Sequence, residues 1–476
     1  MRKAKDVPAQ INAVFTSTDD VIISKHELPD DATYTLVYCE GLIDSNLLYQ
    51  SLLPNLSHVV GQPKRQKGAV LDRYFEPVPI SLQENYMDTV EKHVFLGSVV
   101  VYIHESHFLY SISIPKIMNR NVEESNMEVS IRGPRDGFIE SATDNVSLIR
   151  KRLKTSTLKV KTYSIGRRSH TQVKLLYMDD VIEPKLLTEI DKRLKSIDIS
   201  IVASSYQIEE LLYDNTYSLV PLVEYSGRPD FVVDAINEGR FAIIIDGNPS
   251  ALIGPTNFSL LIRSAEDTQS SFFYVNAERL IRITALITSI LLPGFWLAVT
   301  SYQIDQIPFP LVATVSQSRV GLPLSLPLEI FLMLLFFELF KEAGIRLPKP
   351  VGQTVAVLGG LIVGDAAIRA GLTSPATLVV GAITLISTYT LTDQSLAGNI
   401  LIIRFFIVGL AALLGLYGFF IGVFLLLIYI ASLTSFGFPF VRPLNRMKNI
   451  NDSVFRLPVK KDRTRSVTYY PTDPKK

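Results

Sequence analysis

The stretch Ile283–Ile304 reads ITALITSILLPGFWLAVTSYQI and contains no Asp, Glu, Lys or Arg. At 1.5 Å of rise per residue, a helix of this length crosses the roughly 30 Å hydrocarbon core of a bilayer. Arg279 and Arg282 stand just before the run, where cytoplasmic flanks of spans carry basic residues. We therefore predict a membrane-spanning helix here, and the fold on either side follows from this change in the character of the chain.

The 476 residues differ sharply in composition before and after this point. Apolar runs dominate from Arg279 to Phe440, whereas the preceding part mixes charged and apolar residues as a water-soluble domain does. We predict a mixed α/β cytosolic N-terminal region of two subdomains, followed by an all-α transmembrane helix bundle and a basic cytosolic tail. The boundaries that we expect for these four parts are 1–150, 151–278, 279–440 and 441–476.

Hydrophobic patterns predict the elements of the N-terminal region. Alternation and β-branched residues indicate strands, and a period near 3.6 residues indicates helices. We find no internal repeat. The predicted strands are Thr33–Cys39, Val99–His104 paired with Phe108–Ile114, Gln172–Met178, Phe241–Ile245 and Ser250–Ile253, and the predicted helices are Leu42–Leu53, Ser141–Lys154 and Pro184–Lys195.

Further apolar segments follow the first predicted span. Leu324–Phe340 and Thr373–Leu391 have the length and composition of spans. Gln353–Gly371 is short, rich in glycine and interrupted by charges, so it is a full span, a broken helix or a re-entrant hairpin. Ile400–Phe438 is too long for one perpendicular helix, and it is either a tilted span with an interfacial extension or two spans joined near Tyr417-Gly418.

Charge and targeting signals predict the sidedness of the chain. After Phe440 the tail carries ten basic and three acidic residues, a net charge of +7 within a chain whose total is +1. The start, MRKAKDVPAQINAVF, lacks the continuous apolar core of a signal peptide, and Cys39 is the only cysteine. We expect both the N-terminal region and the tail to lie in the cytosol, which requires an even number of crossings: four if Gln353–Gly371 is re-entrant, or six if every segment crosses.

Four of the charged residues within the predicted spans are candidate site residues, because each must face protein or water. Glu329 and Glu338 are nine positions apart, which places them on opposite sides of a helix, so they do not both line one pore. One of them faces an ion path, or both lie at interfaces with Glu338 near Lys341. Asp365 and Arg369 are four apart, so we expect them to share a helix face and neutralise each other.

The glycine-bearing run Val357–Gly364, VLGGLIVG, precedes that charged pair. Its glycines permit close helix approach, and its apolar side chains would form a narrow constriction that gates by dewetting. Ordinary helix packing within one subunit is the alternative. The candidate pore and constriction residues are Val357, Gly360, Ile362, Val363 and Gly364.

A second candidate feature lies in the N-terminal region, where two arginines and two glycines surround a proline and an aspartate. Exposed backbone amides and two cations could bind an anion. No phosphate-binding loop of the GxxxxGK[ST] type accompanies them, so a structural turn or a subunit contact is favoured. The residues of this candidate subunit-contact turn are Arg132, Gly133, Arg135, Asp136 and Gly137.

Nothing in the sequence indicates catalysis. Of the six histidines only His104 and His107 are closely spaced, and we expect them to point to opposite faces of a strand. No nucleophile motif, zinc helix or paired-carboxylate frame is present. We therefore expect no enzyme activity, no cofactor, no metal site and no nucleic-acid partner.

Two long stretches carry a resemblance to a known family. They are Asn119–Leu153, NRNVEESNMEVSIRGPRDGFIESATDNVSLIRKRL, and Leu322–Pro375, LPLSLPLEIFLMLLFFELFKEAGIRLPKPVGQTVAVLGGLIVGDAAIRAGLTSP. The chain resembles the A subunits of GerA-type spore germinant receptors from about Asp20 to about Pro443.

This resemblance implies a place in the inner membrane of a bacterial endospore. It implies partners as well: a transporter-like B subunit that senses the nutrient and a lipoprotein C subunit. It further implies a homo-oligomeric ring that forms a nutrient-gated channel for monovalent cations. Two other functions stay open, a membrane-anchored signalling scaffold and a secondary transporter, although we find no inverted repeat in the membrane part.

Overall fold

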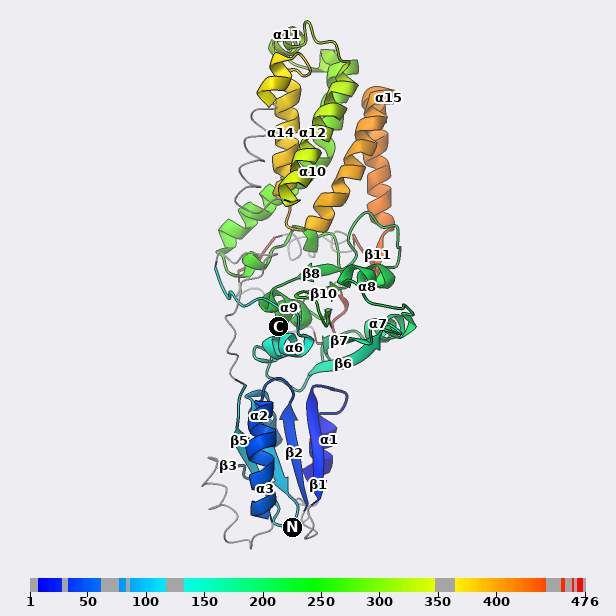
Figure 1. The fold of residues 1–476 in the computed structure, drawn as a ribbon. Helices are drawn as coiled ribbons and strands as arrows, with labels where there is room; N and C mark the ends of the chain where they lie inside the picture. The colour runs from blue at the N-terminus through cyan, green and yellow to red at the C-terminus, as the bar shows by residue number, and fades with distance from the viewer. Residues whose placement is uncertain are drawn as a thin grey trace. The chain divides into compact units, whose positions relative to one another are not determined.

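The computed structural model describes residues 7–27, 33–60, 77–82, 86–116, 132–346, 364–441, 455–458, 465 and 469–473 (Figure 1). The chain divides into two compact units. The N-terminal unit comprises Met1–Thr216, Val223–Thr256 and Val459–Lys476, and the helical unit comprises Tyr217–Leu222 and Asn257–Pro458.

The first subdomain of the N-terminal unit is an antiparallel five-stranded sheet with helices. Its strand order is β1-β2-β4-β5-β3. The predicted strand Thr33–Cys39 and the predicted pair of strands after it are confirmed. The elements are α1 (Val7–Val14), β1 (Val21–Glu27), β2 (Thr33–Cys39), α2 (Ser45–Leu47), the π-helical turn η2 (Leu48–Leu52), α3 (Leu53–Val60), β3 (Val78–Pro79), α5 (Tyr86–Phe95), β4 (Ser98–Ile103) and β5 (Phe108–Ser113).

The helix predicted over Leu42–Leu53 begins later and extends further than expected. Its first turn starts at Ser45, because the side chain of Asp44 accepts hydrogen bonds from the backbone N–H groups of Asn46 and Leu47. Helical structure then continues to Val60.

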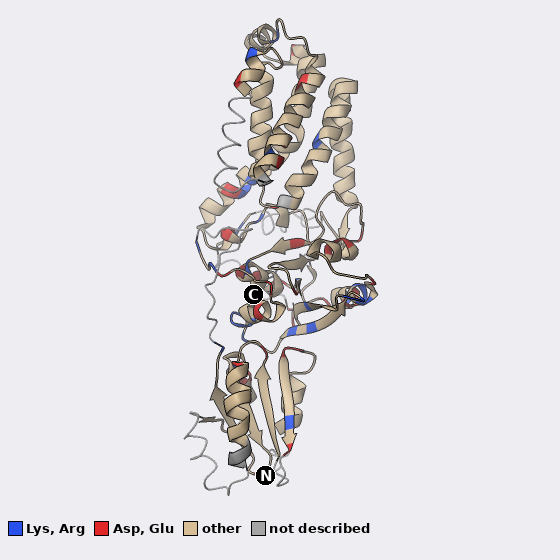
Figure 2. Ribbon diagram, viewed as in Figure 1, with Lys and Arg blue, Asp and Glu red and all other residues tan. Residues whose placement is uncertain are grey.

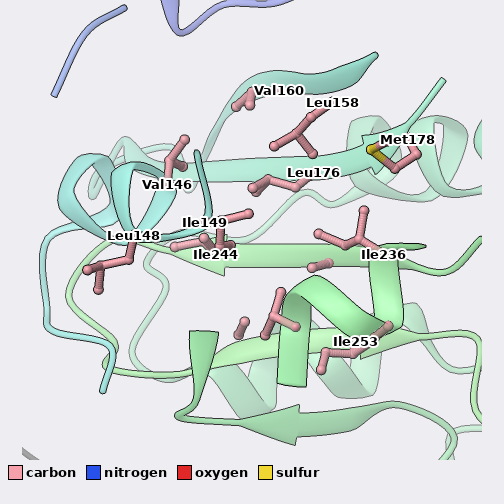
Figure 3. Close-up of a cluster of buried hydrophobic side chains, with 14 of the residues drawn as sticks. Val146, Leu148, Ile149, Leu158, Val160, Leu176, Met178, Ile236, Ile244 and Ile253 are labelled. Atoms are coloured by element: carbon pink, nitrogen blue, oxygen red, sulfur yellow. The ribbon is translucent and has the colours of Figure 1, made fainter. Parts of the chain in front are cut away.

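The second subdomain has the strand order β6-β7-β9-β10-β8. Its core lies between the sheet and the helices α6 and α9, with Ile149, Ile236 and Ile244 almost fully buried (Figure 3). The helix predicted to end at Lys154 ends at Arg150, and the other predicted elements are found within one or two residues. The elements are α6 (Ala142–Arg150), β6 (Leu158–Ile165), β7 (Thr171–Met178), α7 (Pro184–Ser196), α8 (Ser205–Leu212), β8 (Glu224–Ser226), α9 (Pro229–Asn237), β9 (Phe241–Ile245) and β10 (Ala251–Gly254).

The two subdomains are copies of one topology, so the expectation of no internal repeat was wrong. Each has the same succession of strands, and the strand registers correspond: Val37 pairs with Val100 in the first sheet, as Leu176 pairs with Ala242 in the second. The matching segments TYTLVYCEGLID at 33–44 and QVKLLYMDDVIE at 172–183 share apolar positions and a final acidic residue. This similarity of pattern, with few identical residues, concealed the duplication.

A buried ion pair joins the first subdomain to α6. The Arg150 side chain, with no exposed surface, donates from Nε to Asp20 Oδ2 at 2.6 Å and from Nη2 to Asp20 Oδ1 at 2.9 Å. Its guanidinium lies 4.5 Å from the centre of the Phe95 ring. Burial raises the pKa of Asp20, but the charge and hydrogen bonds of Arg150 outweigh burial, so this pKa lies below its ordinary value.

The helical unit consists mainly of apolar helices, and charged residues are sparse along them (Figure 2). Two of its helices, α10 and α15, are long and apolar enough to cross a membrane. The elements are η3 (Leu260–Ile262), η4 (Ala265–Thr268), α10 (Phe272–Tyr302), η5 (Ile304–Gln306), α11 (Phe309–Ser318), α12 (Leu326–Arg346), α14 (Pro375–Tyr389), α15 (Gln394–Ser432), β11 (Thr434–Ser435) and β12 (Phe438–Pro439).

Helix α15 is a hairpin of two helices that turn at Gly415 (Figure 1). Gly415 has φ 61° and ψ −140°, a conformation that residues with a Cβ avoid. After the turn the chain runs back along itself, because a Cβ placed on Gly422 would lie 3.3 Å from Ile407 Cγ1. Of the two interpretations of Ile400–Phe438, the pair of helices is the one observed, with its turn two residues before the predicted Tyr417-Gly418.

Contacts within the helical unit fix the direction of each helix. The start of α12 touches the start of α14, since Glu329 accepts a hydrogen bond from the backbone of Ser374, so these two helices run parallel. The entry and exit of the unit lie at one end, because the N–H of Phe258 donates to the carbonyl of Phe440 at 3.1 Å. Thr392, after α14, bonds to the carbonyl of Leu261 at that same end.

Candidate functional site

A buried arginine lies among the apolar helices of the helical unit. Arg404, on the first half of α15, is 3% exposed. Its Nε donates to the backbone carbonyl of Ser289 on α10 at 2.7 Å, and its Nη2 donates to Thr388 Oγ1 on α14 at 2.6 Å. Within the described part of the chain, no carboxylate lies within ion-pair distance of it. One cation thus connects three helices, and it is not among the site residues predicted from the sequence.

Pro293 explains why a carbonyl of α10 is available to Arg404. A proline inside a helix has no N–H, so the carbonyl four residues earlier loses its helical partner. That carbonyl belongs to Ser289, and Arg404 replaces the missing donor. The signal for this site was present in the sequence as a proline inside one apolar run and a single arginine inside another.

Glu329 is a second fully buried charge, at the start of α12. Its Oε1 accepts hydrogen bonds from the backbone N–H of Ser374 at 2.6 Å, from Ser374 Oγ at 2.9 Å and from Thr373 Oγ1 at 3.0 Å. Its Oε2 has no hydrogen-bond partner and lies 3.8 Å from Arg319 Nε. A carboxylate at the N-terminus of a helix is favoured by the helix dipole, so Glu329 ties the start of α14 to α12.

The remaining predicted membrane charges form local pairs. Glu338 accepts from Lys341 Nζ at 2.8 Å, the contact expected if Glu338 lies at an interface. Asp365 and Arg369 form an ion pair at 2.8 Å on the helical segment that includes Gly364. Their side chains are 60% and 78% exposed, so the described subunit leaves this pair uncovered.

The position of this pair along the helices can be read from Ala367, which lies between its two members. Ala367 packs with Met333 and Phe337 of α12. These residues are roughly 10 Å and 16 Å from the start of a helix about 30 Å long. The exposed pair therefore lies toward the end of the helical unit where Glu329 is found, because Gly364 packs on Leu378 near the start of α14 and Thr373 bonds to Glu329.

The predicted constriction falls mostly on residues that the structure does not describe: Val357, Gly360, Ile362 and Val363 lie outside the described residues. Gly364 is described, and a Cβ placed on it would lie 3.2 Å from Leu378 Cδ2 of α14. The described end of the run thus packs closely on a neighbouring helix.

The predicted turn at 132–137 is anchored on the second subdomain. Asp136 pairs with Arg152 through both carboxylate oxygens, at 2.7 Å and 2.6 Å. Phe138 is buried in the core there, and its N–H donates to the carbonyl of Gly227 at 2.9 Å. Arg132, Gly133, Arg135 and Gly137 belong to the same irregular segment, in which Gly133 has φ 111°.

The expected placement of two histidines was wrong. His104 and His107 both lie in the turn between β4 and β5, and both contact Tyr102 instead of facing opposite ways. Among the residues that the structure describes, no three His, Cys, Asp or Glu side chains are grouped to hold a metal ion.

Taken together, these features define a class of protein. It has an α/β region of two repeated subdomains, joined to an apolar helical region with helices long enough to span a bilayer and buried charges between them. The family model described as Bacillus/Clostridium GerA spore germination protein matches residues 9–468. The chain therefore belongs to the GerA family of spore germination proteins.

Curated relatives agree over nearly the whole length. Spore germination protein XA of Bacillus anthracis is 39% identical, with 96% of this chain and 94% of that protein covered. Spore germination protein GerLA of Bacillus cereus is 32% identical, with 92% and 89% covered. The crystal structure of the N-terminal domain of the A subunit of the Bacillus megaterium spore germinant receptor GerK3 matches at 24% identity and a TM-score of 0.40, covering 53% of this chain and 95% of that one.

Proposed function

We propose that this chain is the A subunit of a spore germinant receptor and forms a homo-oligomeric, nutrient-gated ion channel component in the spore inner membrane. A nutrient bound by the partner B subunit would shift a closed-to-open equilibrium, with a lipoprotein C subunit completing the receptor. Monovalent cations leaving the spore core would then trigger germination. Family membership and the relatives' names support the receptor role, and the helical unit supplies the argument for a pore.

The helix directions support six crossings over four. Entry and exit lie at one end, so the number of passes is even. Helices α10, α12 and α14 with the two halves of α15 would supply five passes. Since α12 and α14 run parallel, a further pass between them would bring the number to six.

The exposed Asp365–Arg369 pair carries the proposal of a pore. An ion pair on a membrane helix is costly where it contacts lipid tails, so this exposed face favours a neighbouring subunit or water. Both requirements are met if copies of the segment face one another around an aqueous path. The candidate constriction Val357–Gly364 directly precedes the pair in sequence, and would close that path with apolar side chains.

Liposomes loaded with K⁺ and containing the purified full chain provide the test. Val363→Ala or Ile362→Ala is expected to release K⁺ without nutrient, because a smaller side chain widens an apolar constriction. Val379→Ala is the matched control, since Val379 is an exposed valine on α14. Unchanged ion retention in both constriction variants would contradict the proposal.

The two other functions make different predictions. A signalling scaffold tolerates replacement of Gly359–Gly364, and a secondary transporter shows turnover-limited flux that saturates with its substrate. Only a channel gives passive current above transporter rates in a planar bilayer. We propose no enzyme activity for this chain, and none of the relatives named above is named as an enzyme.

A further inference from the structure

The repeat in the N-terminal unit reveals a role for the C-terminal tail. In the first subdomain the segment that follows β5 pairs with the loop after β2, where Pro115 forms an antiparallel bridge with Ile43. Pro115 lies beside Gly97, where an added Cβ would be 3.0 Å from the proline Cβ. The next residue, Lys116, donates its backbone N–H to the carbonyl of Leu42 at 2.8 Å. This proline and its successor cover the junction between the end of α5 and the loop after β2.

In the second subdomain the register places Gly239 where Gly97 lies, and Val181 where Leu42 lies. The two glycines have φ of 84° and 89°, and both follow a helix that leads into a strand. The junction between the end of α9 and the loop after β7 is therefore built like the junction between the end of α5 and the loop after β2. However, the chain after β10 passes at Thr256 into the helical unit, so it does not supply the covering segment.

The tail supplies that segment instead. Pro471 lies beside Gly239, where an added Cβ would be 3.7 Å from the proline Cβ. Thr472 donates its backbone N–H to the carbonyl of Val181 at 2.9 Å, and its hydroxyl donates to the carbonyl of Ile182 at 3.1 Å. A proline followed by a residue that donates to the same carbonyl thus recurs, from a segment more than 200 residues further along the chain.

A buried arginine holds the tail in place. Arg465 Nε donates to the carbonyl of Asn237 at 2.7 Å, and its Nη1 donates to the Asp473 side chain at 2.8 Å and to the Asp473 carbonyl at 2.9 Å. Tyr469 is 3% exposed in the same segment. One cation, one buried ring and backbone hydrogen bonds therefore fix the tail on the second subdomain. A flexible basic extension would not make these contacts.

We infer that the surface formed by Val181, Ile182, Asn237 and Gly239 is a docking site for a Pro-Thr-Asp segment, and that its occupant is the chain's own Pro471–Asp473. Docking completes the second copy of the repeat. This inference is independent of the proposed channel.

Hydrogen exchange on the full chain in detergent, read by mass spectrometry, tests the inference. The amide of Thr472 is expected to exchange slowly, as does that of Lys116 in the first subdomain. Arg465→Ala is expected to accelerate exchange of the peptide that contains Thr472 by about tenfold and to leave the Lys116 peptide unchanged. The control is Arg167→Ala, which removes an exposed arginine of the same subdomain.

Two results would overturn the inference. One is exchange of Thr472 at the rate of an unstructured peptide in the unaltered protein. The other is an equal effect of Arg465→Ala and Arg167→Ala on the tail. A second variant, Thr472→Val, keeps the fold and removes only the hydroxyl that donates to Ile182, so it is expected to give a smaller acceleration in the same peptide.

Discussion

The pairing of Arg404 with the carbonyl freed by Pro293 makes a prediction that a double-mutant cycle can test. Arg404→Met removes the donor to Ser289 and leaves a buried carbonyl without a partner. Pro293→Ala supplies a backbone N–H four residues after Ser289, which can take over that carbonyl. The decrease in the free energy of unfolding caused by Arg404→Met should therefore be smaller in the Pro293→Ala background.

The size of the coupling free energy follows from one hydrogen bond, the one accepted by the Ser289 carbonyl, whose donor differs between the variants. Removing a buried charge can itself be neutral or stabilising, so the single variants combine opposing terms. The cycle cancels these terms and leaves the coupling, which we expect to be about 1–2 kcal/mol. For a unit of this size, that coupling corresponds to roughly 2–8 °C in Tm.

Thermal unfolding of the four proteins in one detergent gives the coupling. The control cycle combines Pro293→Ala with Thr388→Val, because Thr388 contacts Arg404 but not the Ser289 carbonyl. That cycle should be additive. Equal effects of Arg404→Met in both backgrounds, within about 0.5 kcal/mol, would refute the assignment of Arg404 as the replacement donor.

Three further predictions concern packing and charge. Asp20→Asn should destabilise the N-terminal unit by about 3–5 kcal/mol in denaturant titrations, because Arg150 stays buried without its counter-charge. The folded-state pKa of Asp20 lies below the ordinary 3.8, so the stability that ionised Asp20 supplies is present above about pH 4 and is lost as the pH falls further. This loss of stability should be absent from a pH series of Asp20→Asn. Gly381→Val should lower Tm through about 1–3 kcal/mol of overpacking, as its Cβ would lie 2.6 Å from a ring carbon of Phe337, whereas Gly409→Val, with open space around it, should cost less; equal losses would contradict this.

Local pattern was sufficient for most of the individual elements. The strand Phe241–Ile245 and the helix from Pro184 were predicted nearly to the residue, because alternation, helical period and a proline at the first helical position are properties of neighbouring residues. The apolar run at 283–304 likewise predicted the helix that contains it, α10. The family followed from contiguous motifs, which are also local.

Partners distant in sequence were decided only by the tertiary structure. The sequence showed which polar groups require a hydrogen-bond partner once they are buried. They are the carbonyl freed by a proline, an arginine among leucines and isoleucines, and a glutamate at the start of a span. The sequence did not show the partners, since Arg404 meets Ser289 across 115 positions and Glu329 meets Ser374 across 45. A buried polar group has to find a hydrogen bond somewhere, but which group provides it depends on which helices pack together. The same holds for the tail, where Thr472 reaches Val181 because folding has left that carbonyl uncovered by the chain after β10.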